Sequence, residues 1–395
     1  MKISRRAALI SPSPTLAIDT KAKALKAQGV EVINFSAGEP DFDTPQHIKA
    51  AAVQALEEGF TRYTPVAGIP ELRREVARYF SLRGLSYSPE EIVVSCGAKQ
   101  SLYNALQVLL EEGEEAVLIS PYWVSYHEQV KLAGGKPVVV HTDSAEGFKV
   151  TPEALEAALT PRTRAVILNS PCNPTGAVYT RQELESLAEL ARERDIWVIS
   201  DEIYSALLYD GLQHVSIASF PGMKERSIVV DGASKTYAMT GWRIGFAAAP
   251  LPIAQAMISI QSHSTSNPNS IAQKAVLAAL RGSQESVEKM RLEFDRRRLM
   301  MLEGLRAIPG IKCHRPGGAF YLFPDVGELL GKRFRGRILS SSLEIAEVLL
   351  EEFRVAVVPG EAFGAPGYLR LSYATSRDQI EKGLKALSLF VEQLD

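Results

Sequence analysis

The sequence has little cysteine and little histidine, and both scarcities narrow its chemistry. Its three cysteines, Cys96, Cys172 and Cys313, lie far apart among 395 residues. An odd number of separated cysteines forms neither a disulfide framework nor a cysteine cluster for zinc, and it is typical of a reducing compartment. The six histidines are scattered, without a pair at helical spacing. We therefore expect no metal site and no catalytic histidine.

Excess charge and long apolar runs are also missing. The chain has 44 Lys and Arg against 46 Asp and Glu, and no basic tract, which argues against nucleic-acid or membrane-surface binding. No apolar run approaches the roughly 18 residues of a membrane span. Arg5 and Arg6 before Ala-Ala-Leu-Ile resemble a twin-arginine signal, but that apolar stretch is shorter than the about 7–15 residues such a signal needs. We therefore expect a cytoplasmic protein.

What the chain does contain is a repeated order of buried strand, turn and amphipathic helix. The strands are continuous apolar runs, which indicates burial on both faces. They are expected at 92–95, 116–120, 165–170, 196–200 and 227–230, and helices follow the first four at 101–112, 125–134, 181–195 and 203–210. This alternation predicts an α/β fold in which helices cover a largely parallel sheet.

The C-terminal part has a different pattern. Residues 270–306 are helical and charged, and short strands are expected within 319–323, 355–359 and 368–374. We predict a large α/β domain of residues 45–285. A smaller α+β domain would combine residues 1–44 and 286–395, with a long helix between the two.

Reactive side chains follow the strands of the predicted sheet. In an open α/β sheet, ligands bind at the carboxyl ends of the strands. The residues at these ends are Gly97, Ala98, Lys99, Tyr122, Trp123, Asn173, Asp201, Tyr204 and Lys235. A lysine, a carboxylate, an aromatic ring, an amide, a phenol and a glycine turn together match the needs of pyridoxal phosphate.

Each part of that cofactor has a candidate partner. Lys235 would bind the aldehyde as a Schiff base, and buried Asp201 would keep the ring nitrogen protonated. Trp123 would stack on the ring, and Asn173 and Tyr204 would hydrogen-bond its hydroxyl group.

The phosphate would take the N–H groups of the Gly97–Lys99 turn and the charge of Arg243. Ordinary structural roles remain open for several of these residues. Asp201 could cap a helix at 203–210, Trp123 could fill the core, and Arg243 could pair with an acid.

Seven stretches resemble the conserved motifs of class I aminotransferases, the fold-type I pyridoxal-phosphate family. In chain order they are AGEPDFDTP, RYTPVAGIPELR, SPYWVSY, SPCNPTGAVY, SDEIY, GASKTYAMTGWRIG and YLRLSYATS, and they extend over residues 36–376. The subfamily most resembled is that of bacterial aspartate aminotransferases. The resemblance implies a mostly parallel seven-stranded sheet sandwiched by helices, plus a smaller α+β domain.

The resemblance also implies residue roles. Lys235 is the Schiff-base lysine and proton shuttle, Asp201 and Tyr204 act with it, and Asn173 shares the ring oxygen with Tyr204. Arg243, Gly97 and Ala98 bind the phosphate, and Tyr63 reaches the phosphate of the neighbouring subunit, so a homodimer is the active form. A bystander role at a turn stays open for Tyr63.

Substrate contacts follow from the same resemblance. Arg370 binds the α-carboxylate, with Gly38, Asn173 and Trp123 beside it, and a cis bond at Asn173–Pro174 aims the amide. Some members carry a serine where this chain has Gly232, and Ser234 is the candidate replacement.

A dicarboxylate substrate needs a second cation, for which Lys99 with help from Ser13 is the candidate. We therefore expect an aspartate:2-oxoglutarate aminotransferase. Aromatic substrates stay open because a flexible lysine can swing aside. Prephenate is less favoured, because Ser11 stands where relatives that use it carry a basic residue. A pyridoxal-phosphate β-lyase also stays open, whereas a dehydrogenase is disfavoured by the missing G-x-G-x-x-G turn.

Overall fold

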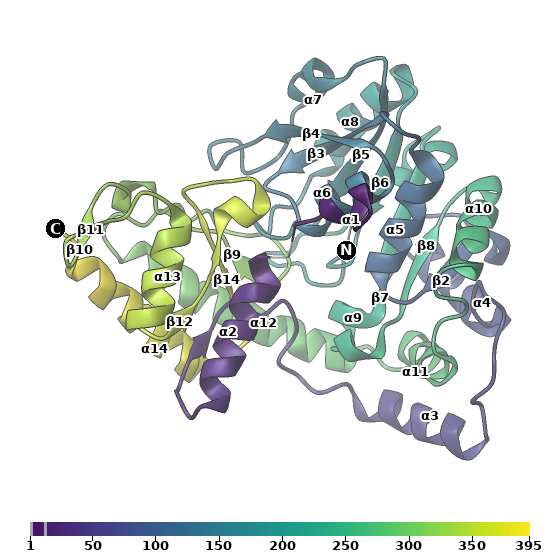
Figure 1. Cartoon of the computed structure of the whole chain (residues 1–395). Coiled ribbons are helices and arrows are strands. Elements are labelled where there is room, and N and C mark those ends of the chain that lie inside the picture. The colour runs from purple at the N-terminus through teal and green to yellow at the C-terminus, as the bar shows by residue number, and fades with distance from the viewer. Residues whose placement is uncertain (1–2, 12–13) are drawn as a thin grey trace.

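The computed structural model describes residues 3–11 and 14–395. Within them, seven strands form one sheet in the order β2-β8-β7-β6-β5-β3-β4 (Figure 1). Their bounds are β2 (Ile92–Ser95), β3 (Glu115–Ser120), β4 (Lys136–His141), β5 (Thr163–Asn169), β6 (Trp197–Asp201), β7 (Ser227–Gly232) and β8 (Gly245–Ala248). In this sheet of the described chain, β8 pairs antiparallel with β2 and with β7, and the other neighbouring strands pair in parallel. The predicted mostly parallel seven-stranded sheet is confirmed.

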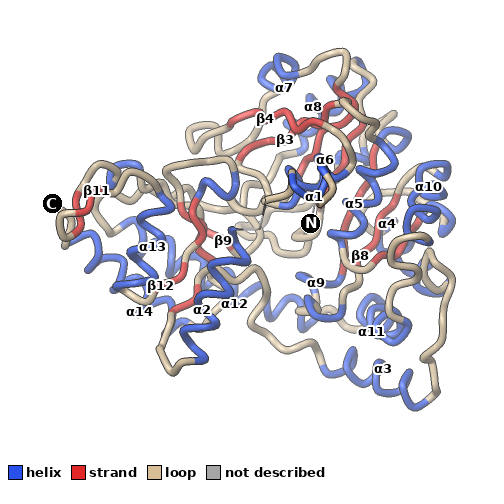
Figure 2. Tube along the Cα trace, in the orientation of Figure 1, coloured by secondary structure: helices blue, strands red, loops and turns tan. Residues whose placement is uncertain are grey.

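Helices cover both faces of this sheet, as Figure 2 shows. Leu118, Ile167 and Ile199 face α5 (Ala98–Leu109), α6 (Ser125–Leu132) and α10 (Leu251–Ser262). The alternate residues Val117 and Val198 face α7 (Pro152–Ala158) and α8 (Arg181–Glu193). The rest of that second face is covered by α4 (Pro70–Ser81) and α11 (Ser270–Arg281), with α3 (Gln46–Glu57) packed alongside. Two-sided burial explains the continuous apolar runs of these strands.

A second body is built around α12 (Glu285–Arg306), α13 (Ser342–Glu352) and α14 (Arg377–Glu392). An antiparallel sheet combines β13 (Val358–Pro359), β14 (Leu369–Ser372) and β9 (Tyr321–Leu322). Two smaller ladders pair β1 (Ile33–Asn34) with β12 (Val355–Ala356) and β10 (Arg333–Phe334) with β11 (Arg337–Ile338). This is the smaller α+β part that the resemblance implied, while the boundaries at residues 45 and 285 stay a prediction.

The N-terminal segment contacts both bodies. Its helices are α1 (Arg5–Ala8) and α2 (Pro14–Ala27). Ala22 of α2 packs on Leu350 and Ala356, and Lys21 pairs with Glu351 at 2.9 Å. Ser11 instead donates its backbone N–H to Glu128 of α6 at 3.0 Å. Its described parts therefore contact the large body at α6 and the smaller body at α13.

Short single-turn elements complete the described chain. They are α9 (Ala233–Thr236) and the 3₁₀ turns η1 (Pro89–Glu91), η2 (Ile217–Ser219), η3 (Lys224–Arg226), η4 (Thr240–Trp242), η5 (Gly327–Leu329) and η6 (Gly360–Phe363). Across residues 3–11 and 14–395, no helix combines the length and apolar character needed to cross a bilayer.

The helix expected at 203–210 is wrong. These residues form turns and pair with residues 317–319 of the second body. Tyr209 donates its N–H to Gly317 at 3.0 Å, and Ala319 donates to Leu207 at 3.0 Å. The apolar side chains that suggested a helical face, such as Leu207, are buried in the core around α12. Partners distant in sequence therefore satisfy this backbone in place of helical bonds.

Candidate functional site

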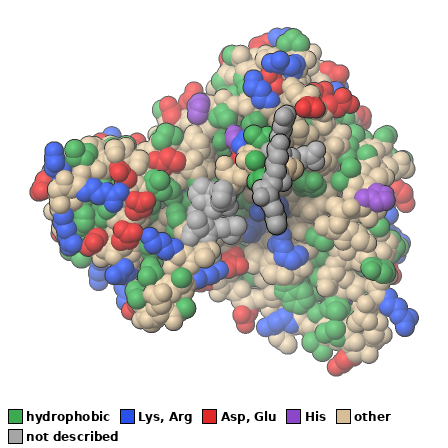
Figure 3. Space-filling view, in the orientation of Figure 1, with side chains coloured by type: hydrophobic (Ala, Val, Ile, Leu, Met, Phe, Trp, Pro, Cys, Tyr) green, Lys and Arg blue, Asp and Glu red, His purple; other side chains and the backbone are tan. Residues whose placement is uncertain are grey.

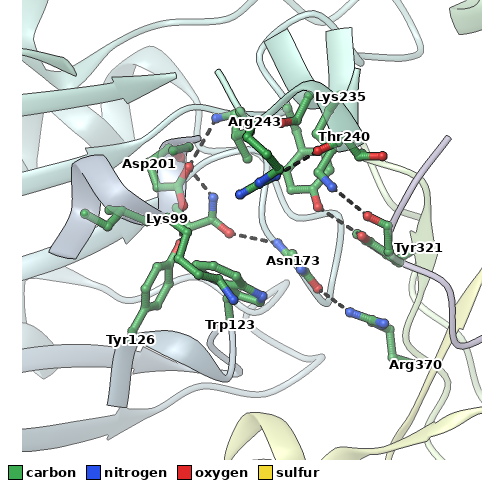
Figure 4. A pocket seen from close by; sticks show the side chains of 17 residues that line it. Lys99, Trp123, Tyr126, Asn173, Asp201, Lys235, Thr240, Arg243, Tyr321 and Arg370 are labelled. Carbon is green, nitrogen blue, oxygen red and sulfur yellow. Dashed lines mark hydrogen bonds between the residues drawn. The ribbon is translucent and has the colours of Figure 1, made fainter. Parts of the chain in front are cut away.

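A cavity of about 270 Å³ lies at the carboxyl ends of β5, β6 and β7, between the two bodies (Figure 4). Most of the predicted site residues line it: Gly38, Ala98, Lys99, Trp123, Asn173, Asp201, Tyr204, Ser234, Lys235, Arg243 and Arg370. Gly97 packs against the side chain of Arg243. The strand-end argument thus brought together side chains as far apart in sequence as Ala98 and Lys235.

Lys235 projects from α9, the short turn that follows β7. Its Nζ donates a hydrogen bond to the carbonyl oxygen of Gly38 at 2.6 Å. Burial, opposed by the charge of Glu39 and helped by Arg243 and Arg370, lowers the pKa of Lys235 to about 8. A lysine with such a pKa is partly neutral near pH 8, as a nucleophile or base must be.

The glycine that departs from the family pattern, Gly232, lies where two strands approach closely. A Cβ there would meet the Cα of Gly245 at 2.9 Å and the carbonyl oxygen of Ile244 at 3.0 Å. A serine would therefore require the β7–β8 pair to move apart. Ser234 is buried and lines the cavity, so it remains the candidate hydroxyl.

Asp201 ends β6 and is 3% exposed. Its Oδ2 accepts from the hydroxyl of Tyr126 at 2.6 Å, and its Oδ1 accepts from the N–H of Ile203 at 3.2 Å. Burial raises the pKa of Asp201 to about 6, although both hydrogen bonds oppose this. Among the described residues, no Lys or Arg forms an ion pair with it. A buried carboxylate without a cation fits a protonated ring nitrogen as its missing partner.

Arg370, on β14, faces the cavity from the smaller body. Its side chain is 2% exposed, and it donates to Asn173 Oδ1 at 3.0 Å and to the carbonyl of Ser36 at 2.8 Å. Its guanidinium lies 4.5 Å from the ring centre of Tyr321, and burial lowers its pKa. Within the described chain, its Nε has no hydrogen-bond partner and no carboxylate pairs with it. An unpaired buried cation of this kind fits an anionic ligand group.

The turn from β2 into α5 approaches Arg243 closely. Gly97 has φ of +88°, and a Cβ on it would lie 2.5 Å from Arg243 Nη2. Gly245 is equally constrained, since a Cβ on it would overlap the backbone of Ala98. The N–H groups that begin α5 therefore lie beside a guanidinium, which is a suitable cradle for phosphate.

Lys99 lies at the mouth of the cavity. Its Nζ is 4.8 Å from the ring centre of Trp123, and desolvation and then Arg243 lower its pKa. Deeper in, the hydroxyls of Tyr204 and Tyr321 are 2.9 Å apart, and burial raises the pKa of Tyr204 well above its ordinary value. The cavity therefore has a cation at its mouth and phenols at its base.

Of the predicted residues, one lies away from this cavity and one falls outside the described residues. Tyr63 lies in the loop between α3 and α4, is 92% exposed, and is absent from the cavity lining. Ser13 lies outside the described residues. Ser11 and Lys99 both line a second cavity of about 550 Å³ beside the first.

Sequence reasoning missed several wall residues. Tyr126 donates to Asp201, the carbonyl oxygen of Thr240 accepts from Arg243 Nη1 at 2.8 Å, and Tyr321 contacts Arg370. Asn169 accepts the N–H of Asn173 at 2.8 Å and so aims it. Asn169 ends β5 and could have been found by the strand-end rule, and Tyr126 lies one helical turn after Trp123.

Three further observations concern the Asn173–Pro174 bond, metal binding and the charge of the surface. The Asn173–Pro174 bond is cis, as expected. In the part of the chain that the structure describes, no group of three His, Cys, Asp or Glu side chains could hold a metal ion. Figure 3 shows acidic and basic side chains intermixed over the visible face.

Comparisons with known proteins show which family this chain resembles. A family model for class I and II aminotransferases matches residues 30–387. The chain is 51% identical over 397 aligned positions to an aspartate aminotransferase of Geobacillus stearothermophilus, with 99% of each chain covered. It is 48% identical to an aspartate/prephenate aminotransferase of Thermus thermophilus, covering 97% of each. A solved Thermus thermophilus aspartate aminotransferase with maleate superposes with a TM-score of 0.93 at 47% identity, covering 99% of this chain and 100% of that one.

Proposed function

Because the chain belongs to the family of class I and II aminotransferases, whose members use pyridoxal phosphate, we propose that it is an aspartate:2-oxoglutarate aminotransferase. The observation that carries the proposal is a pair of cations at opposite sides of one cavity, Arg370 at its inner wall and Lys99 at its mouth. Two cations, each placed to pair with a carboxylate, favour a dicarboxylic substrate.

The residues present fit pyridoxal phosphate. Asp201 would hold the ring nitrogen, Asn173 and Tyr204 the ring oxygen, and Trp123 the ring face. The Gly97–Ala98 turn, Ser234 and Arg243 would hold the phosphate. When bound, the cofactor supplies an aldehyde that accepts the amino group and a cationic ring that withdraws electrons from the reacting carbon.

Lys235 performs the proton transfers in this proposal. Its lowered pKa of about 8 leaves a usable fraction of neutral amine near physiological pH. It takes the proton from the α-carbon of the amino acid and returns a proton when the amino group has moved. The carbonyl of Gly38, 2.6 Å from Nζ, orients the amine between these tasks.

Arg370 and Lys99 orient the substrate. The buried, unpaired Nε of Arg370, together with Asn173, would receive the α-carboxylate. Lys99 would receive the distal carboxylate, with Ser13 beside it. A similar Thermus thermophilus aspartate aminotransferase was solved with maleate, itself a dicarboxylate, which supports a dicarboxylic substrate.

A panel of amino donors with 2-oxoglutarate tests the substrate assignment. For Lys99→Ala, we expect kcat/KM for aspartate to fall by at least about tenfold, the worth of one charge-assisted hydrogen bond, while activity on tyrosine changes little. Lys312→Ala, a change in the exposed Lys312–Glu328 pair of the smaller body, is the matched control. Undiminished aspartate activity in Lys99→Ala would refute the distal-carboxylate assignment.

Prephenate is the second candidate acceptor. The relative named for both aspartate and prephenate, and the cavity of about 550 Å³ that adjoins Lys99, favour it. Adding prephenate to the same panel as an amino acceptor decides this point. A β-lyase would instead release ammonia and pyruvate from a cysteine conjugate without any oxo acid.

We further propose a homodimer in which Tyr63 reaches the partner's phosphate, since this large exposed side chain lies away from its own cavity. Light scattering gives the oligomeric state. Tyr63→Phe should weaken pyridoxal phosphate binding without altering the fold.

Two further parts of the proposal concern location and domain bounds. The free cysteines of the described chain support a cytoplasmic location. Residues 45–285 remain our proposed large domain.

A further inference from the structure

Gln261, on α10, is a buried glutamine whose amide joins three separate segments. It is 0% exposed. Its Nε2 donates to the carbonyls of Val66 and Val94, both at 2.8 Å. Its Oε1 accepts from Ser95 Oγ at 2.6 Å and from Asn104 Nδ2 at 3.0 Å. An amide has two donors and two acceptor positions, so every capacity of this side chain is used.

The segments that Gln261 joins are those to which we assign the phosphate contacts. Val94 and Ser95 end β2, directly before the Gly97 turn, and Asn104 lies on α5, the helix that this turn begins. Val66 belongs to the loop 58–69, which carries Tyr63. One side chain therefore connects the phosphate turn of this chain with the loop that we assign to the partner's phosphate.

A second buried glutamine, Gln273 on α11, holds the same loop from its other side. It is 0% exposed, accepts the N–H of Ile69 at 2.8 Å, and donates to Thr64 Oγ1 at 3.0 Å and to the carbonyl of Pro268 at 2.8 Å. Thr64 is the neighbour of Tyr63 in the chain. The loop is thus fixed on both sides of its exposed tyrosine.

Backbone contacts bring the loop and the strand together without spare room. Val94 donates its N–H to Ala67 at 3.0 Å. Gly68 has φ of +99°, and a Cβ on it would lie 2.7 Å from the side chain of Val94. A displacement of β2 is therefore transmitted to the loop, and the glutamines set the relative position of the two.

We propose that Gln261, supported by Gln273, is a positioning residue that couples the two cofactor phosphate sites of the dimer. It holds the Gly97 turn of its own chain and the Tyr63 loop offered to the partner in one rigid unit. The inference rests on the proposed homodimer and on the role of Tyr63. It predicts that these amides govern how tightly the phosphate group is bound, although neither touches it.

The test compares two ligands that differ only in the phosphate. Apoenzyme is titrated with pyridoxal phosphate and with pyridoxal, following absorbance. For Gln261→Met, which keeps the shape and removes all four hydrogen bonds, we expect about tenfold weaker pyridoxal phosphate binding and less than about twofold change for pyridoxal. Gln284→Met is the control, because Gln284 makes three side-chain hydrogen bonds, against four for Gln261, and joins neither segment. Equal weakening of both ligands would overturn the proposal.

A milder variant guards against failure to fold. Thr64→Val removes the hydroxyl that Gln273 holds, at a half-buried position, and should reproduce the phosphate-selective loss at about threefold. Binding of both ligands like that of the wild type would count against the proposal.

A double-mutant cycle separates this inference from the function on which it rests. If the glutamines act through Tyr63, Gln261→Met should weaken phosphate binding much less in a Tyr63→Phe background than in the wild type. Full additivity would overturn the coupling while leaving the dimer intact. If Tyr63→Phe alone leaves pyridoxal phosphate binding unchanged, the proposed role of Tyr63 fails, and with it the coupling.

Discussion

At the scale of single residues, the site combines ionisable groups that lack protein partners of opposite charge. Asp201 is a buried carboxylate without an ion pair among the described residues, and Arg370 is a buried guanidinium in the same situation. Such groups reduce the stability of the apoenzyme and favour ligands that neutralise them. This property leads to two predictions.

The first concerns Asp201 and pH. Its pKa is about 6 in the fold and 3.8 as an unperturbed group, so the native apoenzyme binds more protons than the unfolded chain between these values. The destabilisation by its charge therefore grows from about pH 4 to 6 and is complete above pH 6. Relative to wild type, Asp201→Asn apoenzyme should gain up to about 3 kcal/mol across that range. Urea unfolding at several pH values measures this, and a pH-independent difference would contradict it.

The same variant should lose most of its activity, because an amide does not hold a protonated ring.

The second concerns Arg370. Arg370→Met removes an unpaired buried charge, so the apoenzyme should keep or gain stability. The variant should nevertheless raise KM for every amino acid donor by about a hundredfold, because all donors carry the α-carboxylate. Lys99→Ala, in contrast, should affect dicarboxylates alone. A donor-dependent response of Arg370→Met would show that the guanidinium serves another group.

At the scale of elements, the sequence predicted the strands that are buried on both faces and failed at strands with weaker patterns. In the seven-stranded sheet, the missed strands are β4, an edge strand with partly exposed residues, and β8, whose Gly-Phe-Ala-Ala sequence is mostly small residues. The helix wrongly expected at 203–210 has a helical apolar spacing, but its side chains pack into the second body. Local pattern does not reveal which distant segment will pair with a backbone.

The N-terminal segment gives the element-scale prediction. Its described contacts with α6 are Ser11 to Glu128 and Lys131 Nζ to the carbonyl of Leu9 at 3.2 Å, and both are exposed. Removing residues 1–11 should therefore reduce stability by less than about 1 kcal/mol. It should impair aspartate turnover more, since Ser11 lines the cavity shared with Lys99. Steady-state kinetics of the truncated protein equal to those of wild type would contradict this.

At the scale of the whole molecule, the site is complete only where the two bodies meet. The strand-end rule found the groups from the large sheet, such as Asp201 and Lys235. Arg370 and Gly38 come from the smaller body, and only the resemblance to a family suggested them. Tyr321 was missed because a short strand in the smaller body gives no sign that it faces the large one.

The long helix α12 connects these bodies through arginines. Arg298 is 0% exposed and donates to both carboxylate oxygens of Asp210, at 2.7 and 2.8 Å, and to the carbonyl of Pro316 at 2.7 Å. Asp210 ends the segment that follows Asp201 and Tyr204. Arg315 also binds Asp210, but its side chain is 50% exposed. The two arginines thus share one partner and differ in burial.

That difference yields a matched pair of variants. Arg298→Met removes a buried cation and leaves Asp210 and the Pro316 carbonyl without it, so we expect a loss of about 3 kcal/mol. Arg315→Met breaks a half-exposed pair, for which less than about 1 kcal/mol is expected. The arginines hold the pKa of Asp210 below its ordinary value, so its contribution should be present above about pH 4 and lost as the pH falls further. Urea unfolding at pH 7 compares the variants. Equal losses would mean that burial does not distinguish the two bonds, and that the connection between the bodies depends on apolar contacts along α12 rather than on Arg298.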